Sequence, residues 1–209
     1  AVRPESSVTS ARLVLDIEKP RTAAMSRGLE AEPRLRQAYL DAYGGAVEHH
    51  ARPWIIAHPT QPYVSVSPDD VWLDGSRRVY LEWKTRNRFA EMRRPMFGRP
   101  GTDEIPDAYA LQVQLNLELL DLDSAVLFVG LGSETPDGTG AKPFLYTATA
   151  PYPIERDRDL IHMALGYAER FYNEHILTRT PPSVEPRENV VAWKRLIKEH
   201  QCMTMEASP

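Results

Sequence analysis

The residues best suited to chemistry are Glu82 and Lys84, which stand two positions apart at the end of an alternating apolar segment. Such alternation is typical of a β-strand, whose side chains point to opposite faces in turn. Glu82 and Lys84 are therefore expected on one face, and Leu81 and Trp83 on the other. A carboxylate and an amine would share one surface of the sheet.

A second carboxylate comes from the segment just before this strand. The dipeptide Asp74-Gly75 lies between two apolar runs, 71–73 and 79–81, and predicts the turn of a β-hairpin. Such a hairpin returns Glu82 toward Asp69. The sequence thus predicts one polar cluster of two carboxylates and a lysine.

This combination suits the binding of Mg²⁺ or Mn²⁺ beside a phosphodiester. Hard divalent ions prefer oxygen ligands, and Mg²⁺ often takes only one or two carboxylates, which leaves positions for water and phosphate. Asp69 and Glu82 supply such ligands, and Lys84 could orient the attacking water. Glu32 falls among the apolar positions of a predicted helix and offers a third carboxylate.

Each of these signals also has an ordinary structural explanation. A Glu-x-Lys pair beside an aspartate is a frequent surface ion pair of nearly neutral energy. Glu32 could be satisfied by Arg27 or Arg36, and Gln112 on a helix margin could simply face solvent. The arginine-rich run 86–99 could be a solvated or partner-facing loop rather than a DNA-binding track.

The elements that must position these residues follow from hydrophobic periodicity and from Gly and Pro punctuation. The pattern predicts helices over 22–43, 105–122, 155–177 and 188–203, and strands over 54–57, 63–66, 71–73, 79–84, 124–131 and 144–148. On the first helix, the apolar stripe is expected to comprise Met25, Leu29, Leu35, Tyr39 and Tyr43. Residues 86–101 are expected to form a loop, 132–142 a hairpin connection and 178–186 a linker.

This order of elements predicts an α/β fold with a mixed central β-sheet flanked by helices. We expect one domain over residues 1–209, with a core from about 22 to 178 and a C-terminal linker and helix over 179–209.

The bulk composition is that of an ordinary globular protein. The net charge of −4 argues against a protein that coats nucleic acid through its global charge, although arginines gather between residues 86 and 99. Cys202 is the single cysteine, and the pair His49-His50 lacks a third ligand, so both histidines are interpreted as surface residues. No apolar run approaches the roughly 20 residues of a membrane span, and we expect a soluble cytoplasmic protein.

Four motifs resemble one known family in order and rough spacing. They are RGLEAEP over 27–33, SPDD over 67–70, LEWK over 81–84 and IPDAYALQVQL over 105–115. Together they resemble the YqaJ-like viral recombinases, the lambda-exonuclease-type members of the PD-(D/E)XK nuclease superfamily. The resemblance implies a restriction-endonuclease-like core fold. It also implies a protein of the cytoplasm of a bacterial or phage-infected cell.

The resemblance also implies roles for particular residues. Asp69, Glu82 and the backbone carbonyl of Trp83 would bind one or two Mg²⁺ or Mn²⁺ ions, joined by Glu32 directly or through water. Lys84 would position the attacking water. The phosphate and DNA contacts implied by the motifs, and by the neighbouring arginines, are Gln112, Ser67, Arg3, Ser10, Arg86, Arg88, Arg93, Arg94 and Arg99.

The chain departs from the family pattern after two of the motifs, with Thr85-Arg86 in place of the usual Cys-Pro after the lysine. The residue after the SPD aspartate is usually glycine in the family and is Asp70 here. Two interpretations of Asp70 are open, an additional metal ligand or a turn residue whose side chain points away from the site.

The function implied is Mg²⁺-dependent 5′ to 3′ digestion of one strand of linear double-stranded DNA. The 3′ single strands would serve phage-type recombination with a single-strand annealing protein, and family members often form trimeric rings around DNA. One alternative is a nuclease of other polarity or an endonuclease, although the cysteines of the iron–sulfur branches are missing. Another is a non-catalytic module that binds DNA ends, which would be expected to have lost Asp69, Glu82 or Lys84.

Overall fold

The structure is a computed structural model that describes residues 23–49, 54–134 and 144–180. Arg3 and Ser10 lie outside the described residues, as do the predicted helix over 188–203, most of the linker over 178–186, and the core of the 132–142 connection. Among the described helices, none is long and apolar enough to cross a membrane.

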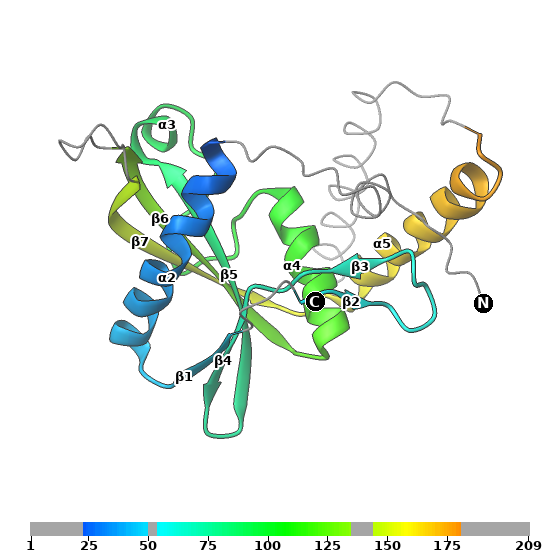
Figure 1. Ribbon diagram of the computed structural model, residues 1–209, viewed down its shortest axis with the longest axis horizontal. Helices are drawn as coiled ribbons and strands as arrows, with labels where there is room; N and C mark the ends of the chain where they lie inside the picture. Colours follow the sequence, from blue (N-terminus) through cyan, green and yellow to red (C-terminus); the bar gives the residue numbers. More distant parts are fainter. Residues whose placement is uncertain (1–22, 50–53, 135–143, 181–209) are drawn as a thin grey trace, which may run out of the picture.

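A five-stranded mixed sheet forms the centre of the fold (Figure 1). Its strands, in spatial order, are β1 (Ala46–His49), β4 (Asp70–Asp74), β5 (Arg77–Asn87), β6 (Ser124–Glu134) and β7 (Phe144–Glu155). Only the β5–β6 pair is parallel, and the other three pairs are antiparallel. The predicted mixed sheet is confirmed.

The predicted strands over 54–57 and 63–66 do pair, but they are shorter and lie outside the main sheet. They form β2 (Ile56–Ala57) and β3 (Ser65–Val66), a separate two-stranded ribbon. The intervening segment, His58 to Val64, carries Pro59 and Pro62, and prolines interrupt a strand ladder because they have no N–H to donate.

Helices cover both faces of the sheet, which makes a three-layered architecture (Figure 1). They are α2 (Ala23–Tyr43), α3 (Arg88–Arg93), α4 (Asp107–Leu120) and α5 (Arg158–Phe171), the last continuing into a π-helical turn, η1 (Tyr172–Ile176). Helix α2 packs on one face, and α4 packs on the other face beside α5.

Strand β5 separates the two cores as its alternation predicts. Leu81 and Trp83 pack with Leu35 of α2, whereas Tyr80 packs with Val113 of α4. Glu82 has the same parity as Tyr80 and therefore emerges on the α4 face.

The predicted hairpin is confirmed, including its register. Asp74 pairs with Arg77, and Gly75 adopts a positive φ of 59°, a conformation that glycine reaches without strain. The ladder continues to the pair Asp70–Leu81, so the next position places Asp69 opposite Glu82. Residues opposite each other in an antiparallel pair share a face, and the two carboxylates meet there.

The predicted apolar stripe of α2 is wrong at two positions. Leu29 and Tyr43 are 47% and 50% exposed, and the buried face instead runs through Ala31, Leu35 and Tyr39. These three residues follow each other at intervals of four, and the small Ala31 side chain lets the helix approach the sheet. The helix also continues through Pro33, which faces solvent, so no new segment begins there.

The arginine-rich segment is more regular than expected. Strand β5 continues to Asn87, and the predicted loop contains α3. The Asn87 side chain caps this short helix by accepting a hydrogen bond from the Ala90 N–H. Parallel pairing with β6 extends the strand as far as Asn87, a tertiary contact that local propensity does not report.

The boundary between β7 and α5 also differs from the prediction. The strand runs to Glu155 rather than ending at 148, because it pairs with β6 along its whole length. Its prolines, Pro151 and Pro153, are tolerated on an edge strand of the sheet. Helix α5 therefore begins at Arg158, where Asp157 caps it by accepting hydrogen bonds from the backbone N–H groups of residues 159 and 160.

Candidate active site

The predicted polar cluster exists on the α4 face of the sheet. Glu82 is only 1% exposed and accepts a hydrogen bond from the Nζ of Lys84. Asp69 lies across the hairpin, and its Oδ2 accepts from the backbone N–H of Trp83 at 3.0 Å. The structure thus brings together the carboxylates and the lysine that the spacing predicted.

Helix α4 adds Gln112 to this cluster. Its Nε2 donates to Oε1 of Glu82 at 2.8 Å, so the amide turns toward the buried carboxylate. Gln112 is exposed, as one interpretation allowed, but its hydrogen bond also joins α4 to the middle of β5. A side chain held in this way stands at the edge of the site, where a phosphate oxygen could compete for its N–H₂ group.

Burial and charge crowding set the protonation of Asp69. Burial raises its pKa to about 7, helped by the negative charge of Glu82, while the Trp83 N–H and Lys84 act in the opposite direction. Two carboxylates this close cannot both ionise at low cost. A site of this kind favours a bound cation, which would remove the cost.

Glu32 approaches the same cluster from α2. Its pKa is raised, first by burial and then by the negative charges of Asp70 and Glu82, against the opposing effect of Arg36 and Lys84. The helix therefore delivers a third carboxylate to the electrostatic environment of the site, in agreement with its predicted place among apolar residues.

Lys84 is held between an acid and an aromatic ring. Besides its bond to Glu82, its Nζ lies 5.1 Å from the centroid of the Tyr109 ring on α4. The negative face of an aromatic ring attracts a cation at this distance. The ammonium group is therefore directed into the site rather than into solvent.

Asp70 lies on the opposite face of the sheet from Asp69. It is a strand residue and not a turn residue, and its side chain is fully buried at 0% exposure. It accepts hydrogen bonds from Arg36 Nε at 2.8 Å and Trp83 Nε1 at 2.6 Å, and its Oδ1 lies 2.7 Å from His49 Nδ1. Both of its oxygens face these groups, on the opposite face of the sheet from Glu82, which does not suit an additional metal ligand.

His49 lies at the surface, as predicted, but it also contacts the buried Asp70. Its Nδ1 lies between Asp70 Oδ1 and an Arg36 nitrogen at 2.9 Å. The Nδ1 of His49 can donate to Asp70 or accept from Arg36, but it cannot do both at once. His50 lies outside the described residues.

The arginines after Lys84 divide into two kinds. Arg86 donates from Nε to Glu91 Oε2 at 2.9 Å, and the other oxygen of Glu91 accepts from the backbone N–H groups of Met96 and Phe97. These hydrogen bonds hold the pKa of Glu91 below its usual value, against the effect of burial. Arg86 and Glu91 therefore shape the segment around α3.

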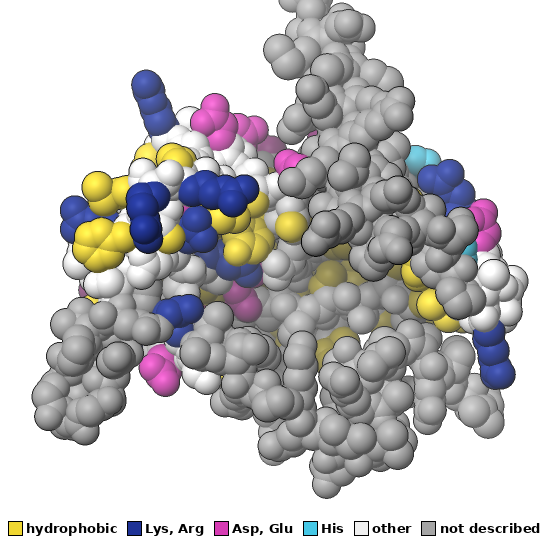
Figure 2. Space-filling view, turned by 90° about the horizontal axis from the view of Figure 1, so that it is seen from above, with side chains coloured by type: hydrophobic (Ala, Val, Ile, Leu, Met, Phe, Trp, Pro, Cys, Tyr) yellow, Lys and Arg dark blue, Asp and Glu magenta, His cyan; other side chains and the backbone are white. Residues whose placement is uncertain are grey.

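The other arginines of this segment lie on the surface, namely Arg88, Arg93, Arg94 and Arg99. Glu91 is the only acidic residue between 86 and 99 and is already engaged by Arg86, which leaves this surface strongly positive. Phe89 and Met92 are 60% and 70% exposed among the arginines. Figure 2 shows basic and hydrophobic side chains side by side at this end of the molecule.

Ser67 is exposed just before the buried Pro68 and lies two residues from Asp69. Its position is compatible with a phosphate contact. Arg3 and Ser10 cannot be placed because they lie outside the described residues.

The donor set fits a hard cation. Asp69 and Glu82 offer carboxylate oxygens, and the predicted ligand at Trp83 is a carbonyl, so all the protein ligands would be oxygen. Within residues 23–49, 54–134 and 144–180, no group of three or more His, Cys, Asp or Glu side chains is arranged as a metal site. Mg²⁺ does not need such a group, because one or two carboxylates and several waters suffice.

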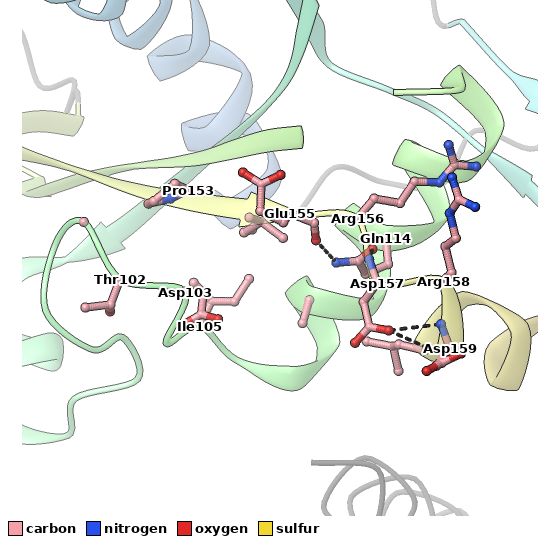
Figure 3. A pocket seen from close by; sticks show the side chains of 14 residues that line it. Thr102, Asp103, Ile105, Gln114, Pro153, Glu155, Arg156, Asp157, Arg158 and Asp159 are labelled. Atoms are coloured by element: carbon pink, nitrogen blue, oxygen red, sulfur yellow. Dashed lines mark hydrogen bonds between the residues drawn. The ribbon is translucent and has the colours of Figure 1, made fainter. Parts of the chain in front are cut away.

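A pocket of about 1010 Å³ lies away from the candidate active site, between the loop after residue 100 and the start of α5 (Figure 3). Its polar groups serve the fold. Gln114 donates from Nε2 to the Glu155 carbonyl and accepts from the Asp157 N–H, both at 2.8 Å. The pocket contains none of the predicted site residues, and we do not assign it a catalytic role.

Two residues of the site were missed by sequence reasoning. Tyr80 is fully buried and donates from its hydroxyl to Oε2 of Glu82, and burial together with Glu82 raises its pKa well above the usual value. Its parity with Glu82 and Lys84 was a signal that could have identified it. Tyr109 is the second, and nothing in the sequence around it pointed to its contact with Lys84.

Solved structures share this fold. LHK-Exo in complex with dAMP superposes with a TM-score of 0.58 at 23% identity, over 78% of this chain and 74% of that chain. The alkaline exonuclease LHK-Exo from Laribacter hongkongensis gives 0.55 at 20% identity, over 93% and 81%. A phage related exonuclease from Haemophilus somnus 129PT gives 0.54 at 18% identity, over 81% and 80%. These similarities confirm the predicted fold.

The family comparison agrees with the motifs. No curated protein matches the chain. The model of the YqaJ-like viral recombinase domain matches residues 5–122, which is more than half of the 209 residues. That range contains Glu32, Asp69, Glu82, Lys84 and Gln112. The chain belongs to the YqaJ-like viral recombinase family.

Proposed function

We propose that this protein is a divalent-metal-dependent deoxyribonuclease that hydrolyses phosphodiester bonds at the ends of double-stranded DNA. One observation carries the proposal. Asp69 just before β4, Glu82 and Lys84 of β5, and Gln112 of α4 converge on one partly buried cluster. The structural relatives described above are exonucleases, which supports the same reaction class.

Asp69, Glu82 and the Trp83 carbonyl would hold the metal ion, with Glu32 nearby to accept a bound water. When bound, the ion would supply a water of lowered pKa and would offset negative charge on the phosphate and leaving oxygens. The raised pKa of Asp69 supports this assignment, because a nearby cation would favour the ionised carboxylate.

Lys84 orients the attacking water and adds positive charge beside the reacting phosphate. Its ammonium group is kept in place by Glu82 on one side and the Tyr109 ring on the other. Tyr80 and Gln112 both donate to Glu82 and so keep its carboxylate oriented. Gln112 and Ser67 would also contact the phosphate, and Arg3 and Ser10 remain proposed contacts to a 5′-phosphate.

The basic surface around α3 would bind the DNA backbone. Its arginines begin four residues after Lys84, a distance of at most about 14 Å along an extended chain. Arg88, Arg93, Arg94 and Arg99 are available for phosphates, whereas Arg86 acts through Glu91 to shape the surface. Such local positive charge makes DNA binding compatible with the negative net charge of −4.

We further propose that digestion runs 5′ to 3′ and leaves 3′ single strands for an annealing protein in phage-type recombination. This finer statement rests on the family resemblance, as does a ring-shaped trimer that encloses DNA. A ring would need positive charge only on its channel lining, which the α3 surface could provide.

A digestion assay tests the proposal. Linear duplex DNA with a 5′-phosphate and a label on one strand is incubated with Mg²⁺, with EDTA, and with the Lys84→Ala variant. Release of mononucleotides from the 5′-phosphorylated strand is expected only for the unmodified protein with Mg²⁺. Release from the 3′ end, or cutting of circular DNA, would refute the polarity, and the absence of any metal-dependent cleavage would refute the nuclease assignment.

A further inference from the structure

We propose that Asp70 is a positioning residue that sets the geometry of the metal and water site from the opposite face of the sheet. This inference rests on the proposed nuclease function. Asp70 does not touch the reacting atoms. It acts through Trp83 and Arg36, which belong to the two elements that carry Glu82, Lys84 and Glu32.

The first link is the indole of Trp83. Trp83 stands between Glu82 and Lys84 in β5, and its Nε1–H donates to Asp70 Oδ2 at 2.6 Å. The same residue uses its backbone N–H to bind Oδ2 of Asp69 at 3.0 Å. Asp70, the first residue of β4, and Asp69 just before it therefore hold one residue of β5, Asp70 through the Trp83 side chain and Asp69 through the Trp83 backbone.

This double attachment limits the freedom of the Trp83 peptide groups. The backbone of Trp83 connects Glu82 to Lys84 and carries the carbonyl proposed as a metal ligand. A ring that is fixed at Nε1 cannot rotate without moving Asp70, which is fully buried. Contacts with Tyr39 and Phe128, at ring-centroid distances of 6.0 and 5.9 Å, hold the rest of the indole.

The second link is Arg36 on α2. Its Nε donates to the same oxygen of Asp70 at 2.8 Å. Arg36 follows Glu32 by one helical turn, so both side chains project from the same side of α2. The buried carboxylate thereby joins the helix that carries Glu32 to the strand that carries Glu82.

The charge of Asp70 gives this arrangement its strength. A buried carboxylate is costly unless it is paired and hydrogen-bonded, and the structure meets this need with the guanidinium of Arg36, the Trp83 indole and the His49 ring. Hydrogen bonds to an ionised acceptor are shorter and about twice as strong as neutral ones. An amide of the same shape would have to present N–H₂ or a single oxygen to these groups, and some of them would lose their acceptor.

The test compares Asp70→Asn with Asp74→Asn, which removes the same charge from the exposed end of the same strand. Urea unfolding first identifies conditions under which all the variants are folded. Isothermal titration with Mg²⁺ in the absence of DNA then measures metal affinity, and steady-state digestion gives kcat and KM. Groups that hold metal ligands in place typically contribute about 10–100-fold to affinity or activity.

Asp70→Asn is expected to weaken Mg²⁺ binding and to lower kcat by about tenfold or more, with KM for DNA changed less than about twofold. Asp74→Asn should match the unmodified protein. Wild-type Mg²⁺ affinity and kcat in folded Asp70→Asn would overturn the inference, because a purely structural role would change only the urea midpoint.

A second variant covers the case in which Asp70→Asn does not fold. Trp83→Phe keeps an aromatic ring in the core and removes the Nε1–H donor to Asp70, together with part of the indole volume. It should reproduce most of the loss in Mg²⁺ affinity and kcat, and the double variant, where it folds, should be no worse than Asp70→Asn alone. Additive losses, or no loss in Trp83→Phe, would overturn the route through Trp83.

The two hypotheses can fail separately. If the unmodified protein binds Mg²⁺ but cleaves no DNA, the proposed function fails, while the Mg²⁺ titrations of Asp70→Asn and Trp83→Phe still decide the positioning role.

Discussion

The crowded carboxylates of the site should make the metal-free protein less stable as the pH rises. Burial and the charge of Glu82 raise the pKa of Asp69 from its ordinary value of 3.8 to about 7. The folded state therefore binds more protons than the unfolded state between these values. The stabilisation is complete below the unfolded pKa and is lost as the pH rises through the folded pKa.

The size of the effect follows from the two pKa values. A difference from 3.8 to about 7, at 1.36 kcal/mol per pH unit, corresponds to about 4 kcal/mol in all. Part of this is already lost at pH 5, where the unfolded carboxyl is mostly ionised. The contribution of Asp69 between pH 5 and pH 8 is therefore about 3 kcal/mol.

The assay is urea unfolding in EDTA at pH 5 and pH 8 for the unmodified protein and for Asp69→Asn. The asparagine keeps an oxygen that can accept from the Trp83 N–H but cannot ionise. The free energy of unfolding of the unmodified protein should fall between these pH values by about 3 kcal/mol more than that of the variant. Equal pH dependence in both proteins would refute the assignment of the raised pKa to Asp69.

Addition of Mg²⁺ supplies a control on the same reasoning. A bound cation favours the ionised carboxylate, so Mg²⁺ should stabilise the unmodified protein more at pH 8 than at pH 5. Asp69→Asn should show a much smaller stabilisation at both values. A larger effect of Mg²⁺ at pH 5 would contradict the proposed site.

Three further predictions concern other parts of the site. Lys84→Ala should lower kcat by about 10²–10⁴-fold while DNA binding persists, measured by digestion and by anisotropy in EDTA; full activity would remove Lys84 from the mechanism. Tyr80→Phe removes a donor to a buried carboxylate and should reduce the free energy of unfolding by about 1.5–3 kcal/mol, and an unchanged urea midpoint would contradict the role of that hydroxyl. The double variant Arg93→Ala/Arg94→Ala should weaken DNA binding and flatten its logarithmic salt dependence by about 0.9 per lost phosphate contact, with Arg77→Ala, on the distant β4–β5 turn, as a control. An unchanged salt dependence would place the DNA elsewhere.

Local pattern was sufficient for the strand side of the site. Alternation along β5 put Glu82 and Lys84 on one face, and the Asp-Gly turn returned the chain so that Asp69 met Glu82. These are short-range properties, in which backbone geometry leaves few choices. The same alternation places Tyr80 on the face of Glu82 and Lys84, so its place in the site could also have been predicted.

Boundaries that depend on long-range pairing were not predictable in this way. Strand β7 runs to Glu155 because β6 lies beside it, and β5 extends to Asn87 for the same reason. The buried face of α2 was likewise chosen by the sheet, which left Leu29 and Tyr43 exposed although they are apolar. Apolar composition alone does not show which face of a helix will pack against the sheet.

The sequence by itself determined the hairpin, the mixed fold and the types of residue in the cluster, because each depends on neighbours within a few positions. Only the tertiary structure decided that Gln112 donates to Glu82, that burial raises the pKa of Asp69, and that Asp70 faces Arg36, His49 and Trp83. Burial and charge proximity are properties of the packed chain. Asp70, for which the sequence left two interpretations, is a buried residue whose hydrogen bonds join α2, β1, β4 and β5.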